Sequence, residues 1–341
     1  MNNRKNKIAI VGVWYGNHNP DYFDFWLKSA SFNDKIDFYI IGEINGKTQL
    51  PDNVFYVPMA LSEIEARIQE KINLKVKVKR PYKLCDFRPA YGLIFADILI
   101  GYDYWGHCDF DLIWGNLQKI LEDYHYSQYD VFLNRGHLTL YRNNESINQL
   151  FMKQGDICGG YRSVFQSPIN WGFDETQGMN KIIAKNKISS FTENVCADID
   201  FRKERLCHAA ETNSLTKNYD YQAFYWENGK VIKVYIDDNH EIATIDYPYI
   251  HLQRRKNMVQ QDFQFNKRIW ITNHGFYNDD SKEITKENIK LANSFHSKEK
   301  ELAEEEQFSK KHWKLKVRKL LTTTTLGREI IKLYYFLKAS N

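Results

Sequence analysis

The sequence has no run of about 18 apolar residues, which excludes a membrane-spanning helix. None of its five cysteines form a C-x-x-C pair, so neither a disulfide framework nor a zinc site is expected, and a reducing cytoplasm is the expected location. Only 17 glycines and 7 prolines among 341 residues exclude a collagen-like or linker-dominated chain. The apolar run at residues 8–14 is too short for a signal peptide and is expected to form a first strand.

The composition is that of a globular protein with a sizeable core, because 43% of the residues are hydrophobic and 26% are charged. The net charge of +4 is unevenly distributed. Residues 309–341 hold nine lysines and arginines and one acid, a balance of +8, which leaves −4 for residues 1–308. A nucleic acid or an anionic membrane would therefore meet this basic tail first.

Short β-branched runs alternate with amphipathic stretches over the first 72 residues. The order strand, helix, strand, strand, helix predicts a three-layer α/β sheet of the nucleotide-binding kind. Neither G-x-G-x-x-G nor a P-loop follows the first strand, so a nucleotide would be held in another way. Residues 155–230 are loop-rich, and residues 281–308 are polar and expected to be helical or mobile. The predicted strands are 8–13, 36–41, 54–57, 102–111, 131–133, 138–141, 231–236, 249–252 and 269–272, and the predicted helices are 21–32, 61–72, 82–99 and 146–153.

Two acids at positions i and i+2, Asp109 and Asp111, stand at the end of a short aromatic strand pattern. In a strand these side chains share one face, while Phe110 points into the opposite, apolar layer. Two carboxylates side by side repel at pH 7 unless a cation lies between them, and Mg²⁺ and Mn²⁺ prefer such oxygen ligands. The Asp-x-Asp pattern therefore favours a metal site, with an ordinary turn as the alternative.

Residues 79–116 carry a resemblance to a known family. The segment reads KRPYKLCDFRPAYG at residues 79–92 and YDYWGHCDFD at residues 102–111. This combination resembles an uncharacterised bacterial family that occurs with capsular and exopolysaccharide synthesis genes and is itself similar to GT-A glycosyltransferases. The resemblance fades to isolated motifs by about residue 260 and does not cover the basic tail. It implies a GT-A-like, Rossmann-type mixed sheet flanked by helices.

The same resemblance implies roles for individual residues. Asp109 and Asp111 match the motif that holds Mn²⁺ or Mg²⁺ against the diphosphate of a nucleotide sugar. The preceding segment is expected near the nucleotide, with an ordinary ion pair as the alternative. The loop after the first strand is expected to receive the nucleoside, and one of its aromatic rings either stacks on the base or packs in the core. The residues of these two segments are Lys83, Asp86 and Arg88, and Trp14 and Tyr15.

The segment NWGFDE at residues 170–175 is similar to an acidic loop that several inverting GT-A transferases place beside the acceptor hydroxyl. An attacking sugar hydroxyl needs a carboxylate within hydrogen-bond reach to accept its proton. Asp174 is the first candidate for this base and Glu175 the second. A solvated turn is the alternative.

The segment YIHLQRRK at residues 249–256 supplies a late histidine followed by cations. A histidine in this part of the chain often completes the metal shell in GT-A enzymes, which assigns His251 to the metal. Arg254 and Lys256 would neutralise a leaving nucleoside diphosphate. The alternative for His251 is a strand histidine with satisfied hydrogen bonds.

Apolar residues of the tail fall on one helical face from Trp313 to Leu321, with lysines and arginines around them. Basic amphipathic helices of this kind bind anionic membrane surfaces. The tail is thus expected to bind the inner face of the plasma membrane, or else to form a helical hairpin packed on the body or a dimer interface. No recognised nucleic-acid module accompanies its charge, so no nucleic-acid partner is expected.

These observations predict a metal-dependent glycosyltransferase that moves a sugar from a nucleotide-diphosphate sugar to a glycan or lipid-linked saccharide during surface polysaccharide synthesis. The expected catalytic domain covers residues 1–280, with a nucleotide-sugar half up to about residue 120 and an acceptor half after it. Residues 281–341 form a helical extension. A sugar nucleotidyltransferase and a non-catalytic carbohydrate-binding protein are the alternatives.

Overall fold

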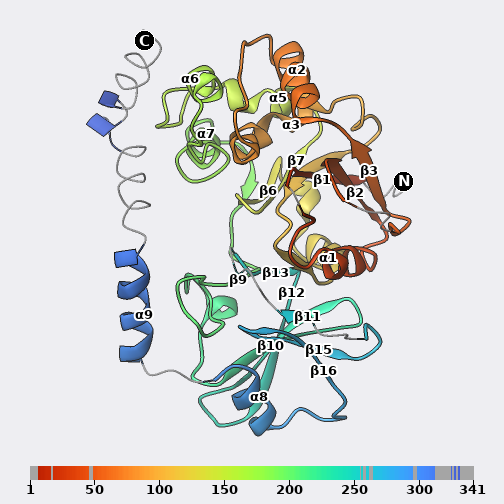
Figure 1. The fold of residues 1–341 in the computed structure, drawn as a ribbon, viewed down its shortest axis with the longest axis vertical. Coiled ribbons are helices and arrows are strands. Elements are labelled where there is room, and N and C mark those ends of the chain that lie inside the picture. The colour runs from red at the N-terminus through yellow and green to blue at the C-terminus, as the bar shows by residue number, and fades with distance from the viewer. Residues whose placement is uncertain are drawn as a thin grey trace.

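A computed structural model describes residues 7–16, 18–45, 49–253, 255, 259–260, 264–294 and 298–311, together with 324, 326–327 and 329–330. These residues form a mixed α/β fold with helices on both faces of its largest sheet. Figure 1 shows this sheet in the upper part of the molecule, a six-stranded sheet in the lower part, and the short strands β9 (Ala197–Asp198) and β13 (Tyr249–His251) between them.

The largest sheet has seven strands in the order β3-β2-β1-β4-β7-β6-β8. The first four strands in this order are parallel, whereas β7 runs antiparallel to both β4 and β6. The predicted mixed sheet flanked by helices is therefore confirmed. Its strands are β1 (Ile8–Trp14), β2 (Ile36–Gly42), β3 (Val54–Pro58), β4 (Tyr104–Cys108), β6 (Val131–Arg135), β7 (Leu138–Arg142) and β8 (Ser190–Phe191).

Helices cover both faces of the seven-stranded sheet. Successive side chains of a strand point to opposite faces, so neighbouring residues pack into different clusters. In β4, Tyr104 packs into the cluster beneath α1 and α4, and Trp105 packs into the cluster beneath the other helices. This explains why the strands read as continuous apolar runs. The helices are α1 (Phe23–Ala30), α2 (Leu61–Ile72), α3 (Tyr91–Ile94), α4 (Leu117–Asp123), α5 (Glu145–Asn148), α6 (Tyr161–Gln166) and α7 (Met179–Lys185), with 3₁₀ segments at Pro81–Ala90, Tyr126–Gln128, Leu150–Met152 and Ser214–Thr216.

Two smaller sheets follow. The six-stranded sheet has the order β12-β11-β10-β15-β16-β14, and the three-stranded sheet has the order β5-β13-β9. The indole of Trp226 donates to the carbonyl of Trp114 at 3.0 Å and so joins the two. Their strands are β10 (Gln222–Glu227), β11 (Lys230–Ile236), β12 (Ile242–Tyr247), β14 (Val259–Gln260), β15 (Arg268–Ile271) and β16 (Gly275–Asp279), and β5 (Leu112–Trp114), β9 (Ala197–Asp198) and β13 (Tyr249–His251).

Two helices, α8 (Lys286–Ala292) and α9 (Lys298–Lys311), follow the six-stranded sheet. Helix α8 packs Ile289 against the six-stranded sheet, and α9 lies along one side of the molecule (Figure 1). Glu301 of α9 pairs with Lys203 at 3.0 Å and with Arg205 at 2.9 Å, which ties α9 to the loop after β9. None of the described helices combines the length and apolar character that crossing a bilayer requires.

The expected membrane-binding face of the tail, Trp313 to Leu321, lies outside the described residues. The seven-stranded sheet extends to residue 191, and the division into a nucleotide-sugar half and an acceptor half near residue 120 stays a prediction. The expected last strand at 269–272 is β15, and one further strand, β16, follows it. All five cysteines are free, in agreement with the absence of a disulfide framework.

Candidate active site

The candidate site lies where the chain reverses its direction across the seven-stranded sheet. From β1 the chain proceeds outward through β2 and β3, and it then returns to add β4 on the other side of β1. The carboxyl ends of β1 and β4 therefore flank a switch point, where open α/β sheets bind ligands. Asp109 and Asp111 directly follow β4, and Trp14 ends β1.

Phe110 fixes this pair of acids in place. Its ring is only 6% exposed and lies against the rings of Trp14, at 5.7 Å between centroids, and Trp26, at 5.2 Å. A Cβ atom on Gly12 would lie 2.7 Å from Phe110, so only glycine leaves room for this ring beside β1. The predicted burial of Phe110 is confirmed, and the carboxylates of its two neighbours keep 28% and 31% of their side-chain surface exposed.

Strand β13 brings His251 to the same place. It pairs antiparallel with β5, where His251 lies opposite Leu112, and the amide of Leu252 donates to the carbonyl of Asp111 at 3.0 Å. As a result, Nε2 of His251 lies 3.3 Å from Oδ1 of Asp111. The structure thus brings together Asp109, Asp111 and His251, and one ligand atom from each lies within 4.8 Å of the others.

The charges at this cluster are strongly coupled. Burial opposes protonation of His251, but the carboxylates of Asp111 and Asp198 outweigh it and raise the pKa of the imidazole to about 10. Burial also opposes ionisation of Asp111, yet His251 holds the pKa of this carboxyl below its ordinary value. Burial raises the pKa of Asp109, against the opposing charge of Arg88 and with the help of Asp111.

The donor set fits a divalent cation. Oδ1 of Asp111 is buried and, within the described chain, makes an ion pair but no hydrogen bond of acceptable geometry. Of the two carboxylate oxygens of Asp109, Oδ1 accepts the hydrogen bond from Arg88, so Oδ2 can bind a metal. Once His251 gives up its proton, the carboxylates of Asp111 and Asp198 lose their cationic partner, and a divalent ion can replace that positive charge. Carboxylate oxygens with one imidazole nitrogen suit Mn²⁺ or Mg²⁺.

Arg88 links three segments behind the acids. Its guanidinium pairs with Asp109, donates to the carbonyl of Gly136 at 2.7 Å and bonds Asp174 at 3.0 Å. Asp174 is only 2% exposed, and burial raises the pKa of its carboxyl well above the usual range. The prediction of Asp174 as the base does not fit this position, because the carboxylate holds Arg88 and cannot face an acceptor in solvent.

Glu175, the second candidate, is exposed beside the same segments. A Cβ atom added to Gly136 would lie 2.5 Å from Cγ of Glu175. The Glu175 side chain therefore packs directly on the turn between β6 and β7, whose Gly136 carbonyl accepts a hydrogen bond from Arg88. Its role as the base stays a prediction.

Lys83 and Asp86 form a buried ion pair of 2.7 Å, with their side chains 1% and 0% exposed. The ammonium also donates to the carbonyls of Val164 and Ile169, and the carboxylate accepts from the amides of Trp171 and Phe173. These bonds occupy both groups, which corrects the expected contact with a nucleotide. The pair instead holds the segment before Asp174 against the 3₁₀ segment Pro81–Ala90.

The residues expected to contact the nucleoside and the diphosphate lie at the end of β1 and after β13. Trp14 and Tyr15 are half-buried at the end of β1, where the indole of Trp14 donates to the carbonyl of His18 at 3.0 Å, so stacking on a base stays a prediction. Arg254 and Lys256 lie outside the described residues. The residue between them, Arg255, donates to the backbone carbonyls of Asp200 at 2.9 Å and Lys203 at 2.6 Å.

A protein family described as one of unknown function (DUF6625) matches residues 10–280. The chain belongs to DUF6625. The match begins within β1, ends just after β16, and includes all residues of the candidate metal cluster. No curated protein matches the sequence significantly.

Solved structures similar to this DUF6625 chain include two glycosyltransferases. The apo form of mouse xyloside xylosyltransferase 1 has a TM-score of 0.33 and 6% identity, over 57% of this chain and 88% of that chain. The galactosyltransferase LgtC, solved with donor and acceptor sugar analogues, has a TM-score of 0.30 and 9% identity, over 56% of this chain and 75% of that chain. Similarity at this level identifies neither activity nor substrate.

The ion pairs of His251 predict a pH dependence for the metal-free DUF6625 chain. Because folding raises the pKa of His251 from 6.5 to about 10, its stabilising contribution is complete below pH 6.5 and is lost as the pH rises through about 10. Urea unfolding in EDTA, measured from pH 6 to 10, should show this loss in the native protein and not in His251→Gln. Parallel profiles for the two proteins would contradict the assigned charge.

Proposed function

We propose that this chain is a metal-dependent glycosyltransferase of the GT-A type, which transfers a sugar from a nucleotide-diphosphate sugar to a glycan or lipid-linked saccharide. One observation carries the proposal: carboxylate oxygens of Asp109 and Asp111 and an imidazole nitrogen of His251 converge within 4.8 Å. They do so at the switch point of a mixed α/β sheet, which is where such a sheet binds ligands.

In this proposal Asp109, Asp111 and His251 hold Mn²⁺ or Mg²⁺. The ion, when bound, would neutralise the diphosphate and so assist its departure from the sugar carbon. Arg88 keeps the carboxylate of Asp109 in place through its bonds to Gly136 and Asp174. Trp14 ends β1 beside Phe110, so a nucleoside over this edge would lie close to both the ion and the rings.

Glu175 is the proposed base for an inverting transfer. Its carboxylate lies on an exposed loop next to the turn after β6, whereas Asp174 is buried beneath Arg88. In this role Glu175 accepts the proton of the acceptor hydroxyl as the new bond to the sugar forms.

Incubation with a panel of nucleotide-diphosphate sugars tests the reaction class. We expect release of free nucleoside diphosphate with Mn²⁺, and loss of this release when EDTA removes the metal, since the carboxylates alone repel a diphosphate. The measurement is chromatography of the nucleotide products, with and without simple saccharide acceptors.

Other products would assign another class. Pyrophosphate formed from a nucleoside triphosphate and a sugar phosphate would indicate a nucleotidyltransferase. Saccharide binding with no nucleotide product under any metal would indicate a non-catalytic carbohydrate-binding protein, and either result would overturn the proposal.

A further inference from the structure

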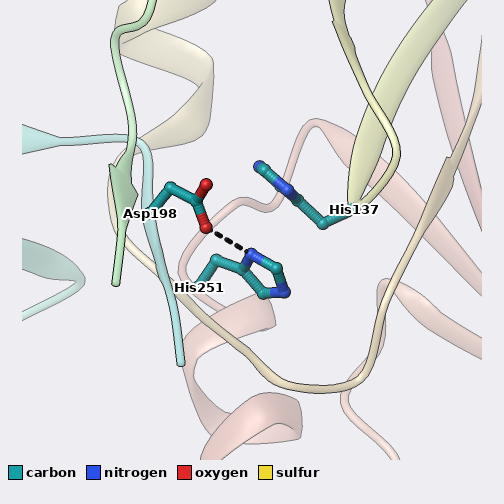
Figure 2. A group of neighbouring side chains, drawn as sticks. All are labelled: His137, Asp198 and His251. Atoms are coloured by element: carbon teal, nitrogen blue, oxygen red, sulfur yellow. Dashed lines mark hydrogen bonds and ion pairs between the residues drawn. The ribbon is translucent and has the colours of Figure 1, made fainter. Parts of the chain in front are cut away.

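The imidazole of His251 has a second partner on the side away from Asp111. Nδ1 of His251 lies 2.8 Å from Oδ1 of Asp198, and the ring of His137 lies over the His251 ring at 4.2 Å between centroids with a tilt of 31° (Figure 2). These three residues come from β13, β9 and the turn between β6 and β7. His251 is therefore bounded by acids at both ring nitrogens.

The three-stranded sheet produces this arrangement. β13 is its central strand, so His251 lies opposite Leu112 of β5 on one side and opposite Asp198 of β9 on the other. The amide of Ile199 donates to the carbonyl of His251 at 3.0 Å, and the amide of Leu252 donates to the carbonyl of Asp111 at 3.0 Å. Backbone bonds on both sides thus fix the distance from each acid to the ring.

We propose that Asp198 is a positioning residue for the metal site: it accepts the Nδ1 proton of His251 and so directs Nε2, as the lone-pair donor, toward the ion shared with Asp109 and Asp111. The inference rests on the proposed metal site. An imidazole that binds a metal through one nitrogen commonly donates its other N–H to a carboxylate, which fixes the tautomer and the ring orientation. No sequence motif marked Asp198 for this role.

Asp198 is itself held in the geometry that this role requires. Nε2 of Gln253 donates to the same Oδ1 at 2.7 Å. Burial opposes ionisation of Asp198, but the hydrogen bond from His251 holds the pKa of its carboxyl well below the usual range. Two hydrogen bonds to one oxygen thus hold the Asp198 carboxylate beside Nδ1 of His251.

His137 covers the His251 ring without competing for the ion. Its Nε2 faces the hydroxyl of Tyr249 at 3.0 Å and the thiol of Cys196 at 3.7 Å. The ring of His137 is 7% exposed, and its contact with His251 is face to face at a tilt of 31°. A buried ring whose Nε2 is already occupied suits a packing partner of His251.

The same three residues have ligand atoms close enough to hold a metal of their own, which is the rival interpretation. It would require Nδ1 of His251 to exchange its hydrogen bond with Asp198 for a metal bond. The two interpretations predict different numbers of ions and different responses to substitution.

Titration of the metal-free protein with Mn²⁺, followed by electron paramagnetic resonance, tests the proposal. Asp198→Asn keeps the size of the side chain but weakens the acceptor, and we expect its dissociation constant for Mn²⁺ to rise by about 10-fold to 100-fold. The spin-echo coupling from a histidine nitrogen should weaken or disappear in the same variant, a change that loss of stability alone does not produce. Asp198→Glu should restore part of both.

Asp123→Asn is the matched control, because Asp123 lies on the surface of α4 with 48% of its side chain exposed. It should bind Mn²⁺ as the native protein does. Circular dichroism of each metal-free variant verifies that the fold is retained.

Three results would overturn the proposal, each in a distinguishable way. Native affinity and native nitrogen coupling in Asp198→Asn would remove the positioning role and leave the metal site intact. A Mn²⁺ ion that remains in the Asp109→Asn, Asp111→Asn double variant and is lost in Asp198→Asn would show a separate metal centre at Asp198. Failure of the native protein to bind Mn²⁺ would remove the proposed function and this inference together.

Discussion

Replacing Asp111 with asparagine is expected to reduce metal-dependent release of nucleoside diphosphate by about a thousandfold, equivalent to about 4 kcal/mol of transition-state stabilisation. The substitution removes one of the two negative charges that follow β4, and the remaining amide oxygen is a weaker ligand for a hard cation. The initial rate of nucleotide-sugar hydrolysis at saturating Mn²⁺ measures the effect, and the Mn²⁺ titration should show a parallel loss of affinity.

This variant should remain folded, because the other carboxylate on His251, that of Asp198, still pairs with the imidazole at 2.8 Å. Asp123→Asn is a suitable control for the loss of one carboxylate on the surface. Unchanged turnover in Asp111→Asn, with native metal affinity, would show that the Asp-x-Asp pair is not the metal site.

Replacing Asp86 with alanine is expected to have the largest effect on stability, about 3–5 kcal/mol. The substitution leaves the ammonium of Lys83 buried without its counter-charge and removes the acceptor for the amides of Trp171 and Phe173. The free energy of unfolding from urea denaturation, followed by tryptophan fluorescence, measures the change.

Asp238→Asn provides the comparison, since its carboxylate pairs with Lys217 at 2.9 Å and its side chain is 83% exposed. Its urea midpoint should match that of the native protein because exposed ion pairs contribute little. A small effect of Asp86→Ala, comparable with that of Asp238→Asn, would show that the pair is not a structural element and would reopen its assignment to ligand binding.

Strands that are buried on both faces were predictable from the sequence. β1 and β2 read as continuous apolar runs because both layers of the sheet contact helices. β12 was missed, since it is the edge of the six-stranded sheet and its residues are mostly exposed or half-buried. β10 was also missed because it begins at a buried polar residue, Gln222, which bonds the carbonyl of Leu206 in a distant loop.

The site was predictable where local spacing determines geometry. Asp109 and Asp111 are two residues apart, and their common position after β4 follows from the chain itself. Asp198 was not predictable, since it belongs to a two-residue strand with no periodicity and meets His251 only through strand pairing.

The assignments of Lys83 and Asp174 failed for a related reason. A charged residue in a motif does not reveal whether its partner is a ligand or another part of the protein. The ammonium of Lys83 bonds carbonyls 81 and 86 positions later in the chain, and Asp174 meets Arg88 across 86 positions. Such long-range pairs become visible only once the fold is known.

Strand β13 has only three residues, and their number determines on which side of the strand His251 lies. Side chains alternate along a strand, so inserting or deleting one residue between Tyr249 and His251 would turn the imidazole to the opposite side of the ribbon. The neighbouring strands fix this position, because His251 is in register with Leu112, which follows Asp111, on one side and with Asp198 on the other. This stretch should therefore tolerate exchange of its apolar residues far better than any change in its number of residues.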